Sequence, residues 1–312
     1  MINVLDVTYS LNKKVSYKPI IIYTTAKRHS NMIEAGTLYI VATPIGNLSD
    51  ITQRALEILH SVDLIAAEDT RHSGKLLSHF GIKTKMFALH DHNEKQKAQY
   101  LIDLVNEGKN IALISDAGTP LISDPGYNLV NIARDQGVTI NPIPGPSAVI
   151  TALSAAGLPT DKFLFAGFLP VKQQARIAEI EKYKNADFTT VFYESPRRII
   201  DTLEYIKQTL GEDKEVVLAK ELTKHFESFI KGNAQKVIDW FGEDKDRQQG
   251  EMVLMLAPNK TEQALSPEAE KLMKLLMAEL PTKKAAAITA QVHDLKKNDL
   301  YKLALTWQEG DE

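Results

Sequence analysis

The chain has 312 residues, of which 44% are hydrophobic and 25% charged, and its formal net charge is −3. A chain of this length and composition can form about two globular domains with well-filled cores. The balanced charge shows no global basic excess, so any contact with nucleic acid has to be local. The absence of cysteine excludes disulfides and thiolate metal sites. No apolar run approaches the roughly 20 residues that span a bilayer.

The segment 1–35 differs in character from the rest of the chain. It is basic, contains one short apolar patch at 20–23, and shows neither a helical nor a strand period. We interpret it as a poorly ordered extension, as is common at chain termini. The patch is too short for the core of a signal peptide. Because Met32 lies just before the first convincing strand, we hypothesise that the chain starts there or that 1–35 is dispensable.

Strands and helices alternate from residue 36 to residue 156, a pattern that predicts an α/β domain with a parallel sheet. A strand at 37–43 ends in a turn that contains glycine. Asp50 followed three residues later by Gln53 fits a capping box for the next helix. The fingerprint GxGxxG is absent, which disfavours an ordinary nicotinamide-binding domain.

Two polar segments follow the next strands. The strand at 63–67 runs into the sequence EDTR at 68–71, which is either part of a site or a helix N-cap with acids in its first turn. In the stretch 86–94, His90 and His92 alternate with acids, so a metal site has to be considered. No third ligand is evident from the spacing, which favours a polar loop that lines a cleft.

The stretch 111–126, IALISDAGTPLISDPG, is central to the prediction. It begins as a β-branched apolar run, typical of a strand buried on both faces, and then breaks into a loop with glycine and proline. Glycine lets a backbone approach a ligand closely, and ligands bind at the carboxyl edge of parallel sheets. A similar loop, PGPSA, follows the strand at 138–143 and opens a helix at 148–156. With the loop after 37–43, three such loops follow three strands predicted to be parallel, and we expect one ligand site.

A second α/β domain is predicted after the hinge sequence Gly-Leu-Pro at 157–159. A charged helix is expected between its first two strands and a second helix at 199–210, and its sheet can be mixed. The expected strands are 163–168, 188–194, 216–220 and 252–257.

The C-terminal segment 260–312 is rich in alanine and leucine and carries no strand signal. Two helices, at 283–292 and 297–306, are expected to flank a short turn, as in a helix-turn-helix. This arrangement brings four lysines near helix starts: Lys283, Lys284, Lys296 and Lys297. Two interpretations stay open, a solvated helical hairpin that packs on a partner and a nucleic-acid contact.

Several motifs succeed one another in the order known from one enzyme family. They are GTLYIVATPIGNLSDIT, AEDTR, LHDHNE, SDAGTPLISDPG, PIPGPSA, FYESPRR, KELTKHFE and GEMVL. From residue 36 to its end the chain resembles the ribosomal RNA small subunit methyltransferase I family, in the tetrapyrrole methylase-like group of S-adenosylmethionine enzymes. One departure is Lys220, where a small residue or cysteine is expected, but it lies beside the motif.

The resemblance implies two α/β domains of the tetrapyrrole methylase type with the cofactor cleft between them, plus a C-terminal helical segment. The corresponding divisions are 1–35, 36–156, 157–259 and 260–312. It also implies a cytoplasmic homodimer that uses S-adenosylmethionine, without a metal or a membrane contact. The implied reaction is methylation of the ribose 2′-hydroxyl of a cytidine in the decoding region of 16S rRNA.

The cofactor loops are implied by the resemblance, position by position, whereas the base and the RNA contacts are hypotheses from the reaction and from the charge pattern. The cofactor-binding residues are expected to be Pro44, Asp116, Gly118, Thr119, Ser147 and Ala148. Candidates for the base that takes the hydroxyl proton are Glu68, Asp69, His90, His92 and Glu94. Residues expected to grip RNA phosphates are Arg71, Arg197, Arg198, Lys283, Lys284, Lys296 and Lys297.

Two other functions stay open on the sequence. A small-molecule methylase, acting on a tetrapyrrole or a similar ring, would have no need of the basic helical tail. A non-catalytic RNA-binding or scaffold protein with a vestigial cleft would bind no cofactor. Assays of methyl transfer and of cofactor binding distinguish these possibilities.

Overall fold

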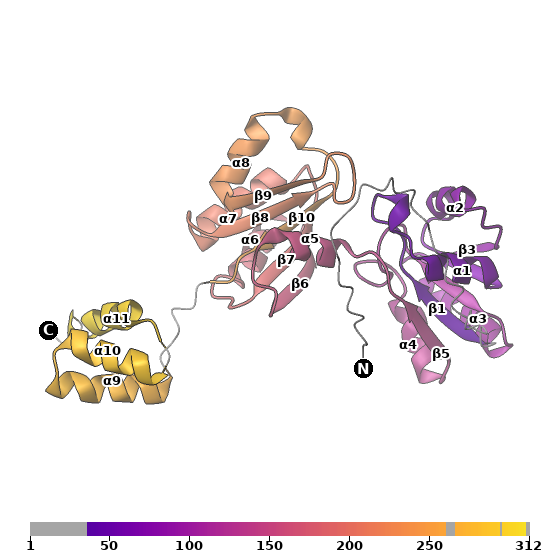
Figure 1. The fold of residues 1–312 in the computed structure, drawn as a ribbon. Helices are drawn as coiled ribbons and strands as arrows, with labels where there is room; N and C mark the ends of the chain where they lie inside the picture. The colour runs from indigo at the N-terminus through magenta and orange to yellow at the C-terminus, as the bar shows by residue number, and fades with distance from the viewer. Residues whose placement is uncertain (1–35, 260–265, 294, 310–312) are drawn as a thin grey trace, which may run out of the picture. The chain divides into compact units, whose positions relative to one another are not determined.

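The computed structural model describes residues 36–259, 266–293 and 295–309. The extension 1–35, and with it the hypothesis about Met32, lies outside the described residues. Two sheets with their helices and then a group of C-terminal helices succeed one another along the chain (Figure 1). In the described ranges, no helix is both long enough and apolar enough to cross a bilayer.

The first sheet has the strand order β3-β2-β4-β1-β5, and every neighbouring pair is parallel, as predicted. Its strands are β1 (Thr37–Val41), β2 (Leu64–Ala67), β3 (Met86–Ala88), β4 (Ile111–Ile114) and β5 (Thr139–Ile143). The helices between them are η1 (Leu48–Asp50), α1 (Gln53–Ser61), α2 (Thr70–His79), α3 (Glu94–Asn106) and α4 (Tyr127–Asp135). Because β4, β1 and β5 are adjacent, their three carboxyl ends lie side by side at one edge.

Strand β4 lies in the middle of this sheet, and all four of its residues are buried. The apolar side chains of α3 and α4 pack with Leu38, Ala66 and Leu113 in one core. The prediction of a strand buried on both faces is therefore confirmed.

The start of α1 differs from the prediction. The helix begins after Thr52, whose hydroxyl accepts a hydrogen bond from the Ala55 N–H at 3.1 Å. Asp50 instead ends the 3₁₀ turn η1, and the extended, buried Ile51 separates that turn from the helix. The capping box of Asp50 and Gln53 was therefore wrong, because burial of Ile51 delays the helix by two residues.

The second sheet has the order β6-β7-β10-β8-β9 and is mixed, with β6 and β7 parallel and the other neighbours antiparallel. Its strands are β6 (Phe163–Phe168), β7 (Thr189–Glu194), β8 (Glu215–Lys220), β9 (Ser228–Asn233) and β10 (Met252–Leu256). The helices are α5 (Ala148–Ala156), α6 (Gln173–Glu181), α7 (Ile199–Leu210), α8 (Ala234–Gly242) and η2 (Lys245–Arg247). The edge strand β9 was not among the predicted elements.

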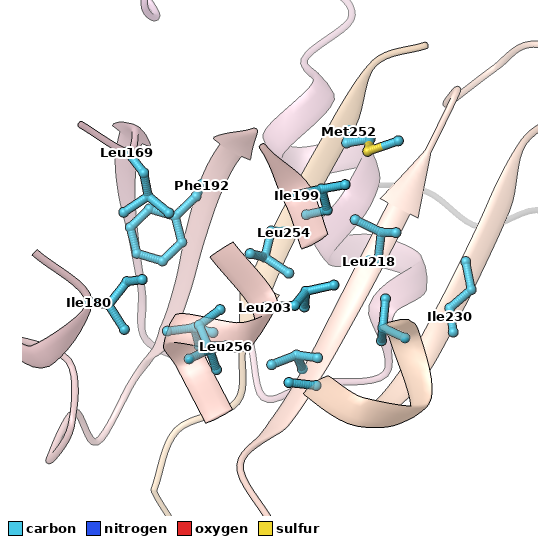
Figure 2. Close-up of a cluster of buried hydrophobic side chains, with 14 of the residues drawn as sticks. Leu169, Ile180, Phe192, Ile199, Leu203, Leu218, Ile230, Met252, Leu254 and Leu256 are labelled. Atoms are coloured by element: carbon cyan, nitrogen blue, oxygen red, sulfur yellow. The ribbon is translucent and has the colours of Figure 1, made fainter. Parts of the chain in front are cut away.

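The two faces of the second sheet are covered by different helices. On one face, side chains of α6, α7 and α8 pack with alternate strand residues such as Phe192, Leu218 and Leu254 (Figure 2). On the other face, α5 packs with Val217 and Val253. Each of these directly precedes a residue of the first set along its strand, so its side chain points to the opposite face of the sheet. Helix α5 thus comes directly after a strand of the first sheet but belongs to the core of the second.

The C-terminal helices α9 (Pro267–Glu279), α10 (Thr282–His293) and α11 (Lys297–Glu309) have a core of their own. Both helices predicted in this segment are present. The four lysines of the prediction are exposed, Lys283 and Lys284 in the first turn of α10, and Lys296 and Lys297 at the start of α11.

Candidate functional site

The loops after β1, β4 and β5 are tied together by hydrogen bonds. Thr43 and Gly118 form an isolated antiparallel bridge, with N–H to carbonyl distances of 2.8 and 3.1 Å. The Thr119 hydroxyl donates to the Pro146 carbonyl at 3.0 Å. The loop after the central strand therefore joins the other two, and the expected convergence is confirmed.

Backbone conformation in the loop after β4 is unusual. Gly118 has φ +81°, and a Cβ there would lie 3.4 Å from Ile45 Cγ2. Leu121 and Ser123 also have positive φ values, +72° and +69°, which residues other than glycine rarely adopt. Such strain persists only where surrounding contacts enforce it, and it concentrates at ligand sites.

A cavity of about 330 Å³ lies against these loops. Four of the six predicted cofactor-binding residues line it: Gly118, Thr119, Ser147 and Ala148. The other two stand beside it. Pro44 is buried next to the lining residue Ile45, and the Asp116 carboxylate accepts a hydrogen bond from the Asp69 N–H at 3.2 Å.

The second sheet and its loops supply the remaining wall. The lining residues from this side are Phe168, Tyr193, Glu194, Ser195, Pro196, Leu222, Gly250, Glu251, Met252 and Val253. None of them was predicted as a cofactor-binding residue, although the motifs FYESPRR and GEMVL contain most of them. They lie at the ends of core strands and in the turns beside them, so only the tertiary structure shows that they face a cavity.

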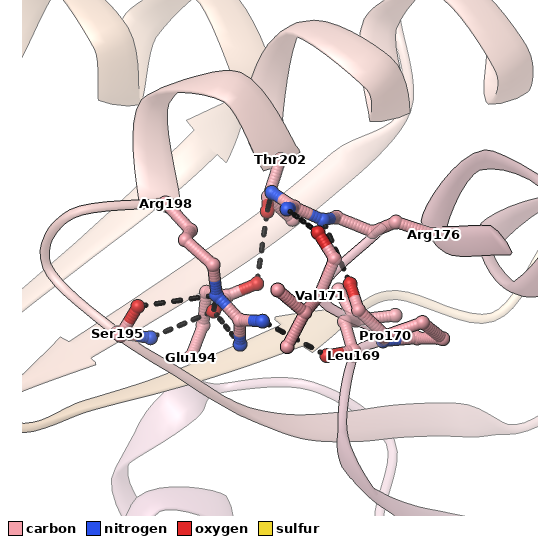
Figure 3. A network of polar contacts seen from close by, with 8 residues as sticks. All are labelled: Leu169, Pro170, Val171, Arg176, Glu194, Ser195, Arg198 and Thr202. Atoms are coloured by element: carbon pink, nitrogen blue, oxygen red, sulfur yellow. Dashed lines mark hydrogen bonds and ion pairs between the residues drawn. The ribbon is translucent and has the colours of Figure 1, made fainter. Parts of the chain in front are cut away.

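Glu194, at the end of β7, has a fully buried side chain in an ion pair with Arg198 at 2.5 Å (Figure 3). Its carboxylate also accepts hydrogen bonds from the Ser195 N–H at 2.7 Å and the Thr202 hydroxyl at 2.9 Å. Arg198 donates further to the Leu169 carbonyl at 3.2 Å. An RNA contact by Arg198 stays a prediction, but its guanidinium already binds protein groups, whereas Arg197 is exposed.

The same network reaches the loop after β6 through a buried arginine. Arg176 donates to the Thr202 hydroxyl at 3.2 Å and to the carbonyls of Pro170 and Val171 at 3.1 and 2.9 Å (Figure 3). Two guanidinium groups thus tie the loop at 169–171 to the turn at 194–198. Both segments adjoin lining residues of the cavity, so the network holds this wall in place.

Carboxylates gather at the edge of the first sheet. Burial raises the pKa of Glu68, and the charge of Asp124 raises it further, against a hydrogen bond from the Asp116 N–H at 3.4 Å. Burial likewise raises the pKa of Asp124, which lines the cavity, and the charges of Asp116 and Asp91 add to this. Across the cavity, burial together with the charges of Asp124 and Glu251 raises the pKa of Tyr193 to about 12. The site therefore favours positive charge in its ligand.

Asp69 and Glu94, two of the other base candidates, are held in helix-capping interactions. Asp69 is the N-cap of α2 and accepts from Arg71, whose hydrogen bonds hold the pKa of that carboxyl far below its usual range. Glu94 is buried, and its carboxylate accepts from the Leu129 N–H at 3.0 Å and the Asn128 amide at 3.2 Å at the start of α4. The N-cap interpretation of the EDTR motif is thus confirmed for Asp69.

The two histidines of the LHDHNE motif lie with their ring centroids 5.9 Å apart. The His90 backbone N–H donates to Asn93 Oδ1 at 3.0 Å, and Asn93 Nδ2 lies 3.0 Å from His90 Nε2. His92 is exposed. In the part of the chain that the structure describes, no group of three or more ligand side chains could hold a metal ion.

An ion-pair cluster of Lys224, Glu221 and Glu251, here called the charged clasp, follows β8 and lies beside the cavity. The Lys224 ammonium bonds Glu221 at 2.9 Å and Glu251 at 2.8 Å. The Lys224 stem lies so close to Gly46 that a Cβ at that glycine would be 2.6 Å from Lys224 Cγ. The clasp thus packs against the loop after β1. Lys220, the departure noted in the sequence, is buried at the end of β8.

Comparison with family models matches nearly the whole described chain. The model of Tetrapyrrole (Corrin/Porphyrin) Methylases matches residues 37–238. A second model, the RsmI C-terminal HTH domain, matches residues 263–308.

Curated relatives extend over both regions. Ribosomal RNA small subunit methyltransferase I of Escherichia coli O157:H7 is 56% identical over 274 residues, covering 88% of this chain and 96% of that protein. The protein of the same name from Vibrio cholerae is 57% identical over 273 residues, covering 87% and 95%.

Solved structures share the fold at low identity. Diphthine synthase matches with a TM-score of 0.56 and 15% identity, covering 71% of this chain and 90% of its own. The cobalt precorrin-4 methyltransferase CbiF matches with a TM-score of 0.53 and 18% identity, covering 71% and 95%. These likenesses confirm the predicted α/β architecture of the tetrapyrrole methylase type.

Proposed function

The chain belongs to the tetrapyrrole methylase family and, within it, to the ribosomal RNA small subunit methyltransferase I group, and from this premise we propose its reaction. It transfers a methyl group from S-adenosylmethionine to ribosomal RNA of the small subunit. The acceptor is the ribose 2′-hydroxyl of a cytidine in the decoding region of 16S rRNA. The observation that carries the proposal is the cavity at which three loops of small residues meet.

The lining suits S-adenosylmethionine. The described residues that form it include no lysine, arginine or histidine, and of their three carboxylates Glu194 and Glu251 are already paired with cations, which leaves Asp124 to favour positive charge. A cationic sulfonium is favoured there, whereas a free phosphate ligand is not. Gly118 and Ala148 leave backbone accessible at the wall, and a volume of about 330 Å³ falls in the range of small-molecule sites.

When bound, S-adenosylmethionine supplies a methyl group on a sulfonium that is its own leaving group. The chain has to hold the acceptor oxygen in line with that methyl group and take one proton. Of the predicted bases we favour Glu68, because its raised pKa makes it a better proton acceptor near neutral pH than the capping carboxylate of Asp69, while the Glu94 carboxylate already accepts hydrogen bonds at the start of α4. Asp124 joins the candidates, because it shares this cluster and lines the cavity.

Substitution separates the base candidates. We expect Glu68→Gln or Asp124→Asn to lower turnover by about 10²-fold or more if that carboxylate takes the proton. Affinity for S-adenosylmethionine, measured by calorimetry, has to be retained for the assignment to hold. Full turnover in either variant would show that the substituted residue is not the base. His92→Ala is tested alongside, because this exposed imidazole was also a candidate.

RNA is gripped by exposed cations in this proposal. Arg71, with 90% of its side chain exposed, and Arg197 serve near the loops, and the four exposed lysines of α10 and α11 serve in the C-terminal helices. These helices have their own core, so removing residues 260–312 leaves both sheets intact. We expect this truncation to weaken binding to small subunits and to flatten its salt dependence by about one unit of slope per lost phosphate contact. An unchanged slope would assign the helices another role.

The assembly and location that accompany this reaction are a homodimer in the cytoplasm. Light scattering on the purified chain tests the dimer. A monomer at micromolar concentration would contradict it.

The decisive experiment is methyl transfer from labelled S-adenosylmethionine to isolated small ribosomal subunits, followed by mapping of the methylated ribose. Porphyrinoids are offered in parallel, because several structural neighbours are tetrapyrrole enzymes. Labelling of porphyrinoids but not of subunits would show that the chain is a small-molecule methylase. Absence of S-adenosylmethionine binding would favour a non-catalytic RNA-binding or scaffold protein.

A further inference from the structure

We propose that Phe168, at the end of β6, stacks on the nucleobase of the methyl-accepting nucleotide and so holds that nucleotide at the cavity. The inference rests on the proposed function for the identity of the acceptor. An enzyme that modifies one nucleotide of a structured RNA has to unstack it, and apolar or aromatic side chains then replace the lost stacking.

A β-bulge orients this side chain. In the pairing of β6 with β7, Phe165 lies opposite Val191 and Phe168 opposite Tyr193, so β6 has one residue more than β7 between these pairs. Residues three apart on a regular strand point to opposite faces. The extra residue brings both phenylalanines to one face, and Gly167 supplies it with φ +69°. The chain thus uses a glycine to point Phe168 toward the cavity.

Both phenylalanine rings pack on Tyr193. The ring centroids are 4.8 Å apart for Phe165 and 5.3 Å apart for Phe168, with edge-type geometry in each case. Tyr193 and Phe168 line the cavity, whereas Phe165 lies in the apolar core with α5. The three rings form an edge-to-face cluster that is anchored in the core through Phe165 and reaches the cavity with Phe168.

Phe168 nevertheless remains 59% exposed. Ile122, from the strained loop after β4, lines the same cavity and is 43% exposed. Two exposed apolar side chains at one cavity, one on each side, are typical of a slot for a flat ring. Since the proposed function assigns the methyl donor to the loops of small residues, we assign the slot to the acceptor base.

The test uses the full chain and four variants. Phe168→Ala removes the ring, Phe168→Leu keeps apolar area without a π face, and Phe168→Trp restores an aromatic. The matched control is Phe163→Ala at the other end of the same strand, which removes an exposed phenylalanine that does not line the cavity. Each variant is assayed for calorimetric affinity for S-adenosylmethionine and for methyl transfer to small subunits. Binding of a cytidine-containing single-stranded oligoribonucleotide is measured in the presence of S-adenosylhomocysteine.

We expect Phe168→Ala and Phe168→Leu to lose about tenfold or more in oligoribonucleotide affinity and in kcat/KM for small subunits. Phe168→Trp restores both, and Phe163→Ala behaves as the unsubstituted chain. Affinity for S-adenosylmethionine stays within about twofold throughout, because stacking acts on the acceptor.

Two results would overturn the inference: an unchanged oligoribonucleotide affinity in Phe168→Ala, or a loss of S-adenosylmethionine affinity as large as the loss of turnover. The second would assign the ring to the cofactor. If the unsubstituted chain binds RNA through Phe168 but labels no subunits, nucleobase stacking on Phe168 stands, whereas the role of that nucleotide as methyl acceptor falls with the proposed function.

Discussion

The two sides of the cavity are held together by different interactions. The side formed by the first sheet consists of loops joined through backbone hydrogen bonds, such as those between Thr43 and Gly118. The side formed by the second sheet consists of side chains and a turn that a buried ion pair, Glu194 with Arg198, holds in place. The first side should therefore respond to changes of backbone freedom, and the second to loss of charge.

The largest effect is expected on the side held by charge. Glu194→Ala leaves Arg198 without its partner and removes acceptors from Ser195 and Thr202. Breaking a buried pair by removing one member costs about 3–5 kcal/mol. We expect a loss of this size in the free energy of unfolding, measured by urea denaturation.

The neighbouring Arg197→Ala is the control for this prediction. Arg197 is exposed, so its loss should stay within about 0.5 kcal/mol. If Glu194→Ala lost less than about 1 kcal/mol, the network would not be what holds this wall.

The backbone side is tested by Gly118→Ala. At φ +81° an alanine is strained by about 1–2 kcal/mol, and its Cβ meets Ile45 Cγ2 at 3.4 Å beside the cavity. We expect S-adenosylmethionine affinity to fall by about tenfold, measured by calorimetry.

Gly137→Ala provides the matched control. Gly137 has a similar φ, +70°, but a Cβ there meets nothing within 4 Å, and the residue lies outside the cavity lining. The strain is the same, so stability should fall while cofactor affinity is kept. Equal affinity losses in both variants would mean that the loop acts only through global stability.

A smaller, pH-dependent effect is expected from the acidic cluster. The pKa of Asp124 is raised in the folded chain, so its ionisation at neutral pH opposes folding. Asp124→Asn should raise Tm by about 1–3 °C at pH 7.5 without cofactor. The gain should shrink as pH falls through the raised pKa of the folded chain and be absent below about 4, where the carboxyl is protonated in both states. A lower Tm at pH 7.5 would show that the ionised carboxylate stabilises the fold.

A last effect, on stability alone, concerns the corrected start of α1, whose capping residue Thr52 is not among the residues that line the cavity. Thr52→Ala removes the hydroxyl that caps α1 and should cost about 1 kcal/mol in urea denaturation. Asp50→Ala, which removes the residue that the sequence favoured, should change stability by less than about 0.5 kcal/mol. A larger loss of stability in Asp50→Ala than in Thr52→Ala would show that Asp50 caps the helix after all.

Much of the first side of the cavity was predictable. Glycine and proline after apolar strands mark backbone turns locally, and parallel strands bring their carboxyl ends to one edge whatever the rest of the chain does. Gly118, Thr119, Ser147 and Ala148 do line one cavity, and their role in cofactor binding stays a prediction. Asp124 was missed, because its position in a turn motif does not reveal which way its carboxylate faces.

The sequence by itself determined the alternation of strands and helices, the three loops and the family, because these depend on local patterns and on the order of motifs. Only the tertiary structure decided that Arg198 binds Glu194, that α5 packs on the second sheet, and that a bulge brings Phe168 beside Tyr193. The packing of α5 and of Phe168 depends on groups that are distant in the sequence. Glu194 and Arg198 are only four residues apart, but the burial of Glu194 depends on the surrounding fold.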